Sequence, residues 1–199
     1  MTDELSPHDA GVALAAESAR FAALGWMRGT SGNLSLVVSR DPLRLAVTAS
    51  GRDKGELTAA DVVVVDAEGR AVAAGATPSA EAALHARVAR VTGAGAVVHV
   101  HTVASVVASR RWPTGVTVAD LEMLKGLGLP ADGEVTLPVV RNGQDMKELG
   151  DRWEAAYRPS VPAVVVADHG LYAWGPTLLK ARHHTEIVQW LLELATYGR

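Results

Sequence analysis

The chain has 199 residues, no cysteine and a formal net charge of -3. A chain of this length buries roughly 70% of its unfolded surface, so we expect a single domain over 1–199 with a substantial core. The weak negative charge excludes a strong attraction to nucleic acid or to an anionic membrane. Without cysteine there is no disulfide and no thiolate metal site, so any metal ion must be held by His, Asp or Glu. We expect a cytoplasmic protein.

The N-terminal segment does not have the pattern of a signal peptide, since it starts acidic and lacks a basic stretch followed by a long apolar one. Apolar runs such as DVVVVD, at 61–66, are far shorter than the ~20 residues that a bilayer requires. We therefore expect a soluble protein with no membrane partner.

The predicted elements interleave helices and strands along the chain. Helical spacing of apolar residues, with Pro and Gly near the boundaries, predicts helices at 6–24, 78–92, 102–109, 120–127, 144–157 and 177–196. Apolar runs rich in valine predict strands at 33–39, 43–50, 61–73, 96–101, 136–140 and 163–175. The strand segment at 61–73 turns back at Glu68-Gly69, and the one at 163–175 is typical of a hairpin. Because the regular β-α alternation of a Rossmann sheet is missing, we expect a three-layer α/β/α domain with a mixed or antiparallel central sheet.

Two histidines stand one residue apart at the end of an apolar strand, in the segment GAVVHVHTVAS. Alternate side chains of a strand share a face, so His99 and His101 point the same way with Cα atoms about 6.5 to 7 Å apart. They can bind one ion together, or they can be half-exposed residues of a strand end. His169 follows a second apolar run in VVVADHG. Three histidines would leave a position open for water or substrate, which is typical of a catalytic metal site.

Three further histidines are interpreted as structural. His85 could add a metal ligand, but its place in EAALHARV favours the surface of a helix. His183 and His184 are adjacent on the last predicted helix and point about 100° apart, so they cannot face one ion together.

Small-residue turns at strand ends are candidates for an anion site. GTSGNLS and TASGRDKG, at 29–35 and 48–55, are rich in Gly, Ser and Thr, so backbone N–H groups and hydroxyls can surround an anion closely. TPSAE adds Ser79 at a predicted helix N-terminus. Each segment alone is equally compatible with an ordinary turn. Arg52 and Lys54 bring positive charge, although Lys54 could instead pair with a neighbouring carboxylate at the surface.

Two glutamates are candidates for moving protons. Glu81 lies in the first turn of the predicted helix, where it could instead be a capping or dipole partner. Glu122 stands between Leu121 and Met123, and we expect an apolar setting that raises its pKa toward neutral. The residues alone leave this choice open.

The motifs HVH, DHG, TSGNLS, SGRDKGEL, PSAE and EMLKGLG occur together in this one chain. With them the sequence resembles the class II aldolase/adducin family from GWMRGTSGNLS to the terminal helix. HGLYAWG and EMLKG point to the branch of the family that dehydrates methylthioribulose 1-phosphate in methionine salvage. The resemblance implies a three-layer α/β/α fold with a nine-stranded, mainly antiparallel sheet. It also implies a homotetramer with sites between subunits.

The resemblance further implies roles for particular residues. The ligands of one divalent ion per subunit, with zinc favoured, would be His99, His101 and His169. The loop positions that hold the phosphate of a small-molecule sugar phosphate would be Asn33, Ser50, Gly51 and Ser79. Glu122 matches the acid/base of the dehydratases and Glu81 that of the aldolases. We favour Glu122 because it lies within the branch-specific motif.

Three functions remain open at this point. The first is metal-dependent dehydration of 5-methylthioribulose 1-phosphate to 2,3-diketo-5-methylthiopentyl 1-phosphate. The second is cleavage or epimerisation of a sugar phosphate by an aldolase or epimerase of the same family, using Glu81. The third is a non-catalytic, adducin-like binding module, which we would expect to lose metal ligands that this chain keeps.

Apolar and aromatic residues leave two further questions open. Trp112, Tyr172 and Trp174 are candidates, by residue type alone, for contact with a methylthio tail. On the last predicted helix one stripe can serve either the core or an interface between subunits, and it consists of Ile187, Trp190, Leu191 and Leu194.

Overall fold

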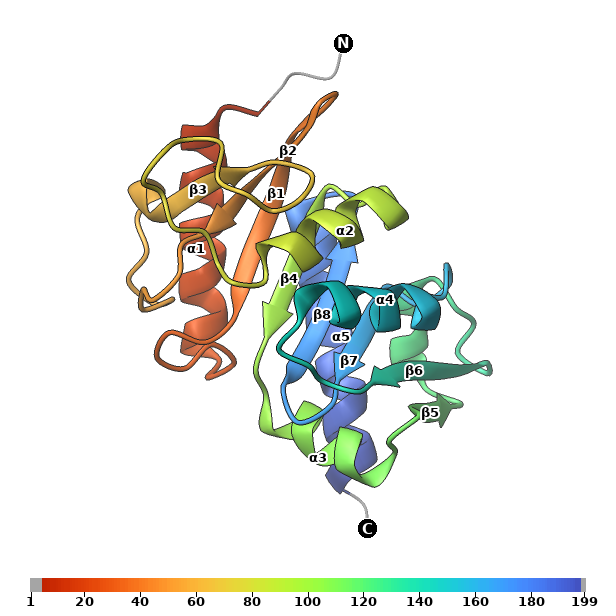
Figure 1. Ribbon diagram of the computed structural model, residues 1–199. Helices are drawn as coiled ribbons and strands as arrows, with labels where there is room; N and C mark the ends of the chain where they lie inside the picture. Colours follow the sequence, from red (N-terminus) through yellow and green to blue (C-terminus); the bar gives the residue numbers. More distant parts are fainter. Residues whose placement is uncertain (1–4, 198–199) are drawn as a thin grey trace.

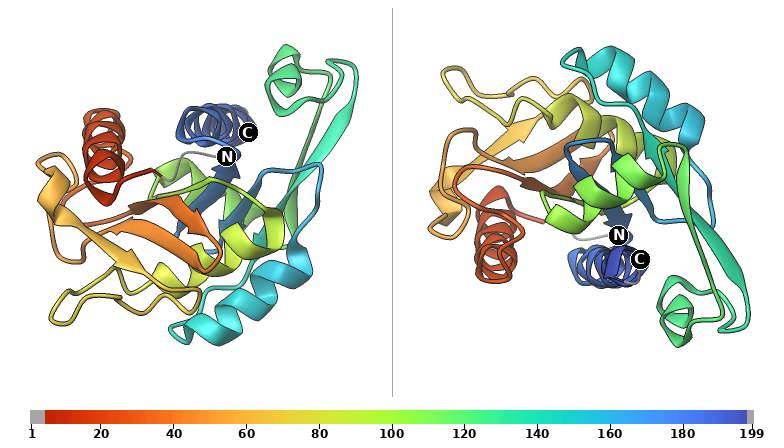
Figure 2. Two further views of the ribbon diagram at one scale, coloured as in Figure 1. Left: turned by 90° about the horizontal axis from the view of Figure 1, so that it is seen from above. Right: turned by 90° about the horizontal axis from the view of Figure 1, so that it is seen from below.

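The computed structural model describes residues 5–197, and within them a single mixed sheet is covered by helices on both faces (Figures 1 and 2). The helices are α1 (Pro7–Ala23), α2 (Ala82–Thr92), α3 (Val103–Arg111), α4 (Met146–Ala156) and α5 (Leu178–Tyr197), with short 3-10 helices η1 (Ala59–Asp61) and η2 (Glu122–Leu127). The strands are β1 (Asn33–Arg40), β2 (Leu43–Thr48), β3 (Val62–Val65), β4 (Ala96–Val100), β5 (Gly115–Ala119), β6 (Glu134–Val140), β7 (Ala163–Val166) and β8 (Gly170–Gly175).

The sheet has the strand order β3-β2-β1-β4-β8-β7-β6-β5. Every neighbouring pair is antiparallel except β6 and β7, so the expected mainly antiparallel sheet is confirmed. Within residues 5–197 it has 8 strands, one fewer than the family resemblance implies. β4 lies at the centre, where His99 pairs with Asn33 on β1 and with Tyr172 on β8.

The helices form the two outer layers predicted from the sequence. α1 and α5 cover one face of the sheet and α2 and α4 cover the other, as Figure 2 shows. Along β4, Val98 and Val100 belong to the apolar cluster that contains residues of α1 and α5, whereas Val97 packs with residues of α2 and α4. Because side chains alternate along a strand, His99 is directed to the α2 side.

Local chemistry explains where several elements begin. The Ser6 hydroxyl caps α1 by accepting a hydrogen bond from the Asp9 N–H at 3.1 Å. α2 begins at Ala82, later than the predicted 78, because Pro78 forms a bridge with Ala49 that holds the preceding residues outside the helix. This displaced start leaves residues 79–81 free to line a cavity.

Three segments differ between the prediction and the structure. β5 was not predicted, since its short alternating GVTVA motif acquires its partner only when β6 lies beside it. The segment at 61–73 gives only the four residues of β3, and its return is an isolated bridge between Val65 and Ala71. The short helix at 120–127 is a 3-10 helix over Glu122–Leu127. It stands at the far end of the β5–β6 arm, away from the sheet (Figure 2).

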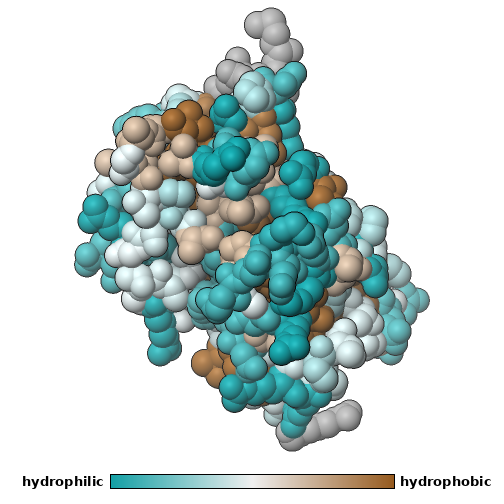
Figure 3. Space-filling view, in the orientation of Figure 1, coloured by the Kyte–Doolittle hydropathy of each residue, from teal (hydrophilic) through white to brown (hydrophobic). Residues whose placement is uncertain are grey.

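The surface is uneven in character. Hydrophilic side chains cover the face over α2 and α4 (Figure 3). On α5 the predicted apolar stripe divides, because Leu191 is fully buried while Trp190 is 40% and Leu194 42% exposed. Among the described residues, no helix combines the length and apolar character needed to cross a membrane.

Candidate active site

Three histidines from different parts of the fold meet at the end of β4. The Nε2 atom of His99 lies 2.8 Å from Nε2 of His101 and 3.3 Å from Nε2 of His169. The rings are packed edge to face, with centroids 4.5 to 4.8 Å apart. Three imidazole nitrogens therefore converge on one small volume.

The sheet fixes the orientation of His99. Its ring stacks on Tyr172 of β8, with centroids 4.0 Å apart and an interplanar angle of 13°. Its Nδ1 atom lies 3.1 Å from the carbonyl oxygen of Leu171. Because a carbonyl only accepts, Nδ1 carries the proton and Nε2 presents its lone pair to the other histidines. This is the tautomer that a metal ligand needs.

The other two histidines are held by chain turns. His101 follows β4 directly, and its backbone N–H donates to the Trp26 carbonyl at 2.9 Å. His169 lies in the tight turn between β7 and β8, where Asp168 takes a φ of 55° and the His169 N–H donates to Val166. A short connection between two buried strands thus carries the third imidazole to the end of β4.

A carboxylate completes the cluster. Glu81, at the start of α2, has one oxygen 3.3 Å from Nε2 of His99 and the other 3.4 Å from Nε2 of His169. The Asn33 amide donates to Oε2 of Glu81 at 2.7 Å and so fixes the carboxylate. Sequence position alone placed Glu81 in the first helical turn, but the contact with the histidines depends on α2 packing against β4.

Burial and charge set the ionisation of these groups. Burial lowers the pKa of His99 to about 3 and that of His101 to about 4. Burial of Glu81 raises its pKa, but the attraction of His99, the Asn33 hydrogen bond and His169 outweigh it and leave that pKa at about 2. At neutral pH the cluster therefore combines neutral imidazoles with an ionised carboxylate, which is the state in which these groups bind metal ions.

The donor set fits a divalent cation. One donor atom from each of Glu81, His99, His101 and His169 lies within 4.8 Å of all the others. In a tetrahedral zinc site with Zn–N distances of 2.0 to 2.1 Å, ligand nitrogens lie about 3.3 Å apart, close to the separation between His99 and His169. Oε1 of Glu81 and Nδ1 of His169 are buried without a hydrogen-bond partner.

A cavity of about 420 Å³ opens beside this cluster, and the predicted anion-binding residues line it. Its walls include Glu81, His101 and His169 together with Asn33, Ser50, Gly51 and Ser79. The bridge between Ala49 and Pro78 brings the segments TASGRDKG and TPSAE side by side. The structure thus brings two of the predicted metal ligands, His101 and His169, into one cavity with the predicted phosphate loops, while His99 is buried behind them.

Gly32 lets a further turn approach the cluster. Its φ is 75°, and a Cβ at this position would lie 2.8 Å from the carbonyl oxygen of His99. Only glycine adopts this conformation at that distance without strain. The turn of GTSGNLS therefore closes over the end of β4.

Glu122 does not join the site of its own chain. It lies on η2, its side chain is 78% exposed, and its carboxylate pairs with Lys125 at 2.7 Å. The expected apolar setting is therefore wrong for this chain, because η2 packs Leu124 into the core and leaves the Glu122 side chain in solvent. Glu122 does not line the cavity described above.

The structure also corrects the interpretation of buried polar residues. His85 is not on a helix surface but fully buried, with Nδ1 2.8 Å from the Ser35 hydroxyl. Burial lowers its pKa to about 4, against the attraction of Glu81. Lys54 is buried as well, rather than paired at the surface. His184 binds the Trp174 carbonyl at 2.7 Å, as a structural histidine would.

Residues after β6 line the cavity without having been predicted. They are Asn142, Gly143, Gln144 and Met146. The Asn-Gly pair between a strand and a helix was the available signal for a turn at this place. Two aromatic candidates for a methylthio tail, Tyr172 and Trp174, are instead buried and do not line the cavity.

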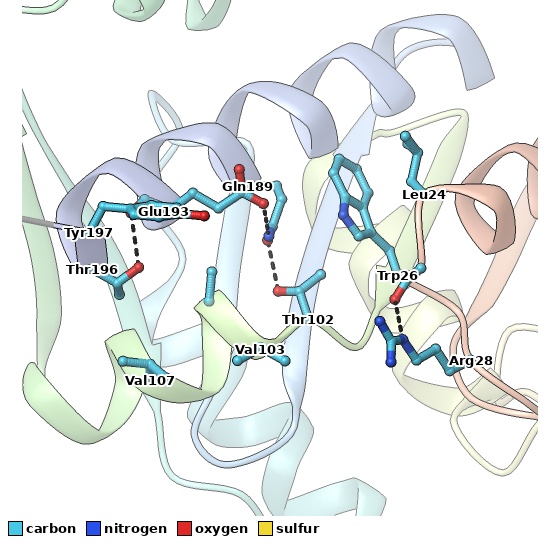
Figure 4. A pocket seen from close by; sticks show the side chains of 12 residues that line it. Leu24, Trp26, Arg28, Thr102, Val103, Val107, Gln189, Glu193, Thr196 and Tyr197 are labelled. Carbon is cyan, nitrogen blue, oxygen red and sulfur yellow. Dashed lines mark hydrogen bonds between the residues drawn. The ribbon is translucent and has the colours of Figure 1, made fainter.

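A second cavity, of about 450 Å³, lies between α3, the end of α5 and the turn after α1 (Figure 4). Thr102 and Gln189 are joined across it by a hydrogen bond of 2.7 Å. Val103 and Tyr197 are exposed at its edge. None of the clustered histidines lines it.

The fold and the cluster define the class of protein. The sequence pattern of the family described as "Class II Aldolase and Adducin N-terminal domain" matches residues 12–196. The chain therefore belongs to the class II aldolase and adducin family.

The chain is similar to several named enzymes of this family. The chain is 40% identical over 174 residues to methylthioribulose-1-phosphate dehydratase of Sulfurihydrogenibium sp., covering 85% of this chain and 81% of that protein. It is 35% identical over 173 residues to the enzyme of the same name from Persephonella marina, covering 85% and 80%. Among solved structures, L-fuculose-1-phosphate aldolase from Thermus thermophilus superposes with a TM-score of 0.75 at 25% identity, covering 94% of each chain.

Proposed function

We propose that this protein is a metal-dependent lyase that removes water from 5-methylthioribulose 1-phosphate and forms 2,3-diketo-5-methylthiopentyl 1-phosphate, a step of methionine salvage. One observation carries the proposal: the three imidazole nitrogens and the Glu81 carboxylate converge at the wall of a cavity that the predicted phosphate turns also line. Relatives at 35% to 40% identity carry the name of this activity. A cytoplasmic location is part of the proposal and rests on the absence of cysteine.

The proposed cofactor is one zinc ion per subunit, held by His99, His101 and His169. When bound, the ion polarises the substrate's carbonyl and stabilises the negative charge that develops on its oxygen. The neutral imidazoles supply the lone pairs, and the Asn33 amide keeps the Glu81 carboxylate beside them. The phosphate is bound by the remaining cavity residues, Ser50, Gly51 and Ser79, with Asn33 at their edge.

The proposed chemistry needs a carboxylate that moves two protons. It takes the proton from carbon 3 and gives a proton to the hydroxyl that leaves carbon 4 as water. The resulting enol tautomerises to the diketone. We assign this role to Glu122, and because it lies outside the cavity of its own chain, it acts in the site of a neighbouring subunit.

The proposed assembly is a homotetramer, which places η2 of one subunit at the cavity of the next. Exposed apolar side chains on α3 and α5 support an oligomer, since Val103 is 79% exposed and Trp190 and Leu194 are 40% and 42% exposed. Sedimentation of the purified protein tests the assembly, and a monomer would contradict it. Mixing inactive His99→Ala and Glu122→Gln subunits provides a sharper test. Activity returns in mixed oligomers only if Glu122 acts across the interface.

A product assay with metal content measured on the same sample tests the function. Zinc-loaded protein incubated with methylthioribulose 1-phosphate is expected to form the diketone phosphate. Glu122→Gln is expected to lower kcat by at least ~10²-fold, the typical contribution of a general acid or base. A fully zinc-loaded sample that leaves the substrate unchanged would contradict the proposed function.

The contact of Glu81 with His99 and His169 favours a second candidate, an aldolase that breaks the bond between carbons 3 and 4. It predicts release of a phosphorylated three-carbon ketone instead of water. Glu81→Gln would then abolish turnover while Glu122→Gln would not. The same assay with both variants distinguishes the two reactions.

A further inference from the structure

Lys54 is a buried lysine that the proposed reaction does not yet use. It is 2% exposed, and its Nζ donates to the carbonyl oxygens of Thr30 at 3.1 Å and Arg52 at 2.9 Å. Its backbone N–H donates to Gly29. One side chain thus joins the two turns, around 29–32 and 50–53, that border the cavity beside the histidines.

The positive charge of Lys54 has no carboxylate partner in the described part of the chain, where no Asp or Glu oxygen lies within 4.0 Å of Nζ. The adjacent Asp53 directs its carboxylate to the Gly55 N–H at 2.8 Å. A buried ammonium without an opposite charge in direct contact is costly. Burial lowers the pKa of Lys54, and the attraction of the nearby Asp53 carboxylate offsets only part of that effect. The missing negative charge is therefore expected from outside the chain.

The cavity shows where that charge would lie. Lys54 lines it together with Ser50, Gly51 and Ser79. Arg52, the other cation of this segment, is paired with Asp61 at 3.3 Å. An ammonium has three N–H donors, and the two carbonyls occupy two of them. One donor remains for an anion beside the small-residue turns.

We infer that Lys54 is the counter-charge for the phosphate group of the substrate, and that it selects phosphorylated over unphosphorylated ketoses while it holds the two turns together. The inference deepens the proposed function and rests on it. Hydroxyl and backbone N–H donors alone also bind neutral polar groups, whereas an ammonium in a partly enclosed cavity favours a dianion. Lys54 makes its side-chain contacts with the two turns, and we assign it to binding rather than to proton transfer.

Substitution separates this role from a structural one. In the zinc-loaded protein, Lys54→Met is expected to weaken the binding of inorganic phosphate, measured by calorimetry, by about 10- to 100-fold, the loss typical of a charge-assisted hydrogen bond. For the sugar phosphate, KM rises while kcat changes by less than about threefold, because the lost contact is to the phosphate group and not to the reacting carbons. Preference over the unphosphorylated ketose falls by a similar factor. Lys147→Met is the matched control and keeps wild-type phosphate binding, because this exposed lysine of α4 pairs with Asp151 and does not line the cavity.

A measurement on the unsubstituted protein covers the case in which Lys54→Met does not fold. With ¹⁵N-labelled lysine, the side-chain ammonium signal of buried Lys54 is expected to shift on addition of inorganic phosphate, while those of exposed lysines do not. Unchanged phosphate binding in a folded Lys54→Met, or an unshifted Lys54 signal at saturating phosphate, overturns the inference. If phosphate binding depends on Lys54 but no diketone forms, the dehydratase fails and the anion site stands. If diketone forms with an unchanged KM in Lys54→Met, only the inference fails.

Discussion

Replacing His85 by asparagine is expected to remove a large part of the acid sensitivity of the metal-free protein. The ring is fully buried against the Ser35 hydroxyl, and burial lowers its pKa from 6.5 to about 4. In the unfolded chain the His85 ring therefore binds a proton near pH 6.5, whereas in the folded chain it binds one only near pH 4. Because the folded-state pKa is the lower one, stability is full above pH 6.5 and falls as the pH drops below it.

The magnitude follows from the two pKa values. At pH 5 the unfolded histidine is mostly protonated and the folded one mostly neutral, which costs the wild type about 2 kcal/mol relative to pH 7.5. At pH values below 4 the full difference of about 2.5 pKa units amounts to ~3 kcal/mol. Asparagine does not titrate and removes this contribution, although the smaller side chain lowers stability at every pH.

Urea unfolding at pH 7.5 and pH 5 in the presence of a chelator measures the effect. The difference in unfolding free energy between the two pH values is expected to be about 2 kcal/mol smaller in His85→Asn than in the wild type. His99 and His101 titrate in both proteins, so their contribution cancels. His183→Asn, on the exposed face of α5, keeps the wild-type difference. Equal pH dependence in wild type and His85→Asn would refute the reasoning.

Two further predictions concern the metal centre and the strands that support it. Adding zinc to about 100 times its Kd is expected to stabilise the protein by ~2.7 kcal/mol, or roughly 5 to 10 °C in Tm, and a His99→Ala protein that gained the same shift would contradict the ligand assignment. Gly170→Ala is expected to cost about 1 to 3 kcal/mol and to weaken zinc binding, since its Cβ would lie 2.3 Å from the Val100 carbonyl and 3.0 Å from the His99 ring. Gly55→Ala, whose Cβ meets nothing nearer than 3.3 Å, is the control, and equal stability of the two variants in urea unfolding would show that the β4–β8 spacing is not limiting.

The sequence by itself determined the features that depend on near neighbours in the chain. The alternation of valine and histidine in AVVHVH set a buried strand with two imidazoles on one face, and the cap and spacing of 6–24 set α1. The glycine- and serine-rich turns were recognisable for the same reason, since φ freedom is a property of single residues. The third histidine, His169, was recognisable because it follows a second apolar run directly before a glycine.

Only the tertiary structure decided the properties that arise between distant segments. Glu81 becomes part of the cluster because α2 packs across β4, and Lys54 and His85 lose their water because other elements cover them. The sequence of a segment shows neither its burial nor the partner of its charge. His85 was therefore expected on a helix surface, and Lys54 was left open between an anion site and a surface ion pair. Glu122 shows the opposite error. Its apolar neighbours in the sequence predicted a buried carboxylate, but in the structure its side chain is exposed to solvent. The burial of a side chain depends on all the elements that pack around it, and the local sequence pattern describes only one of those elements.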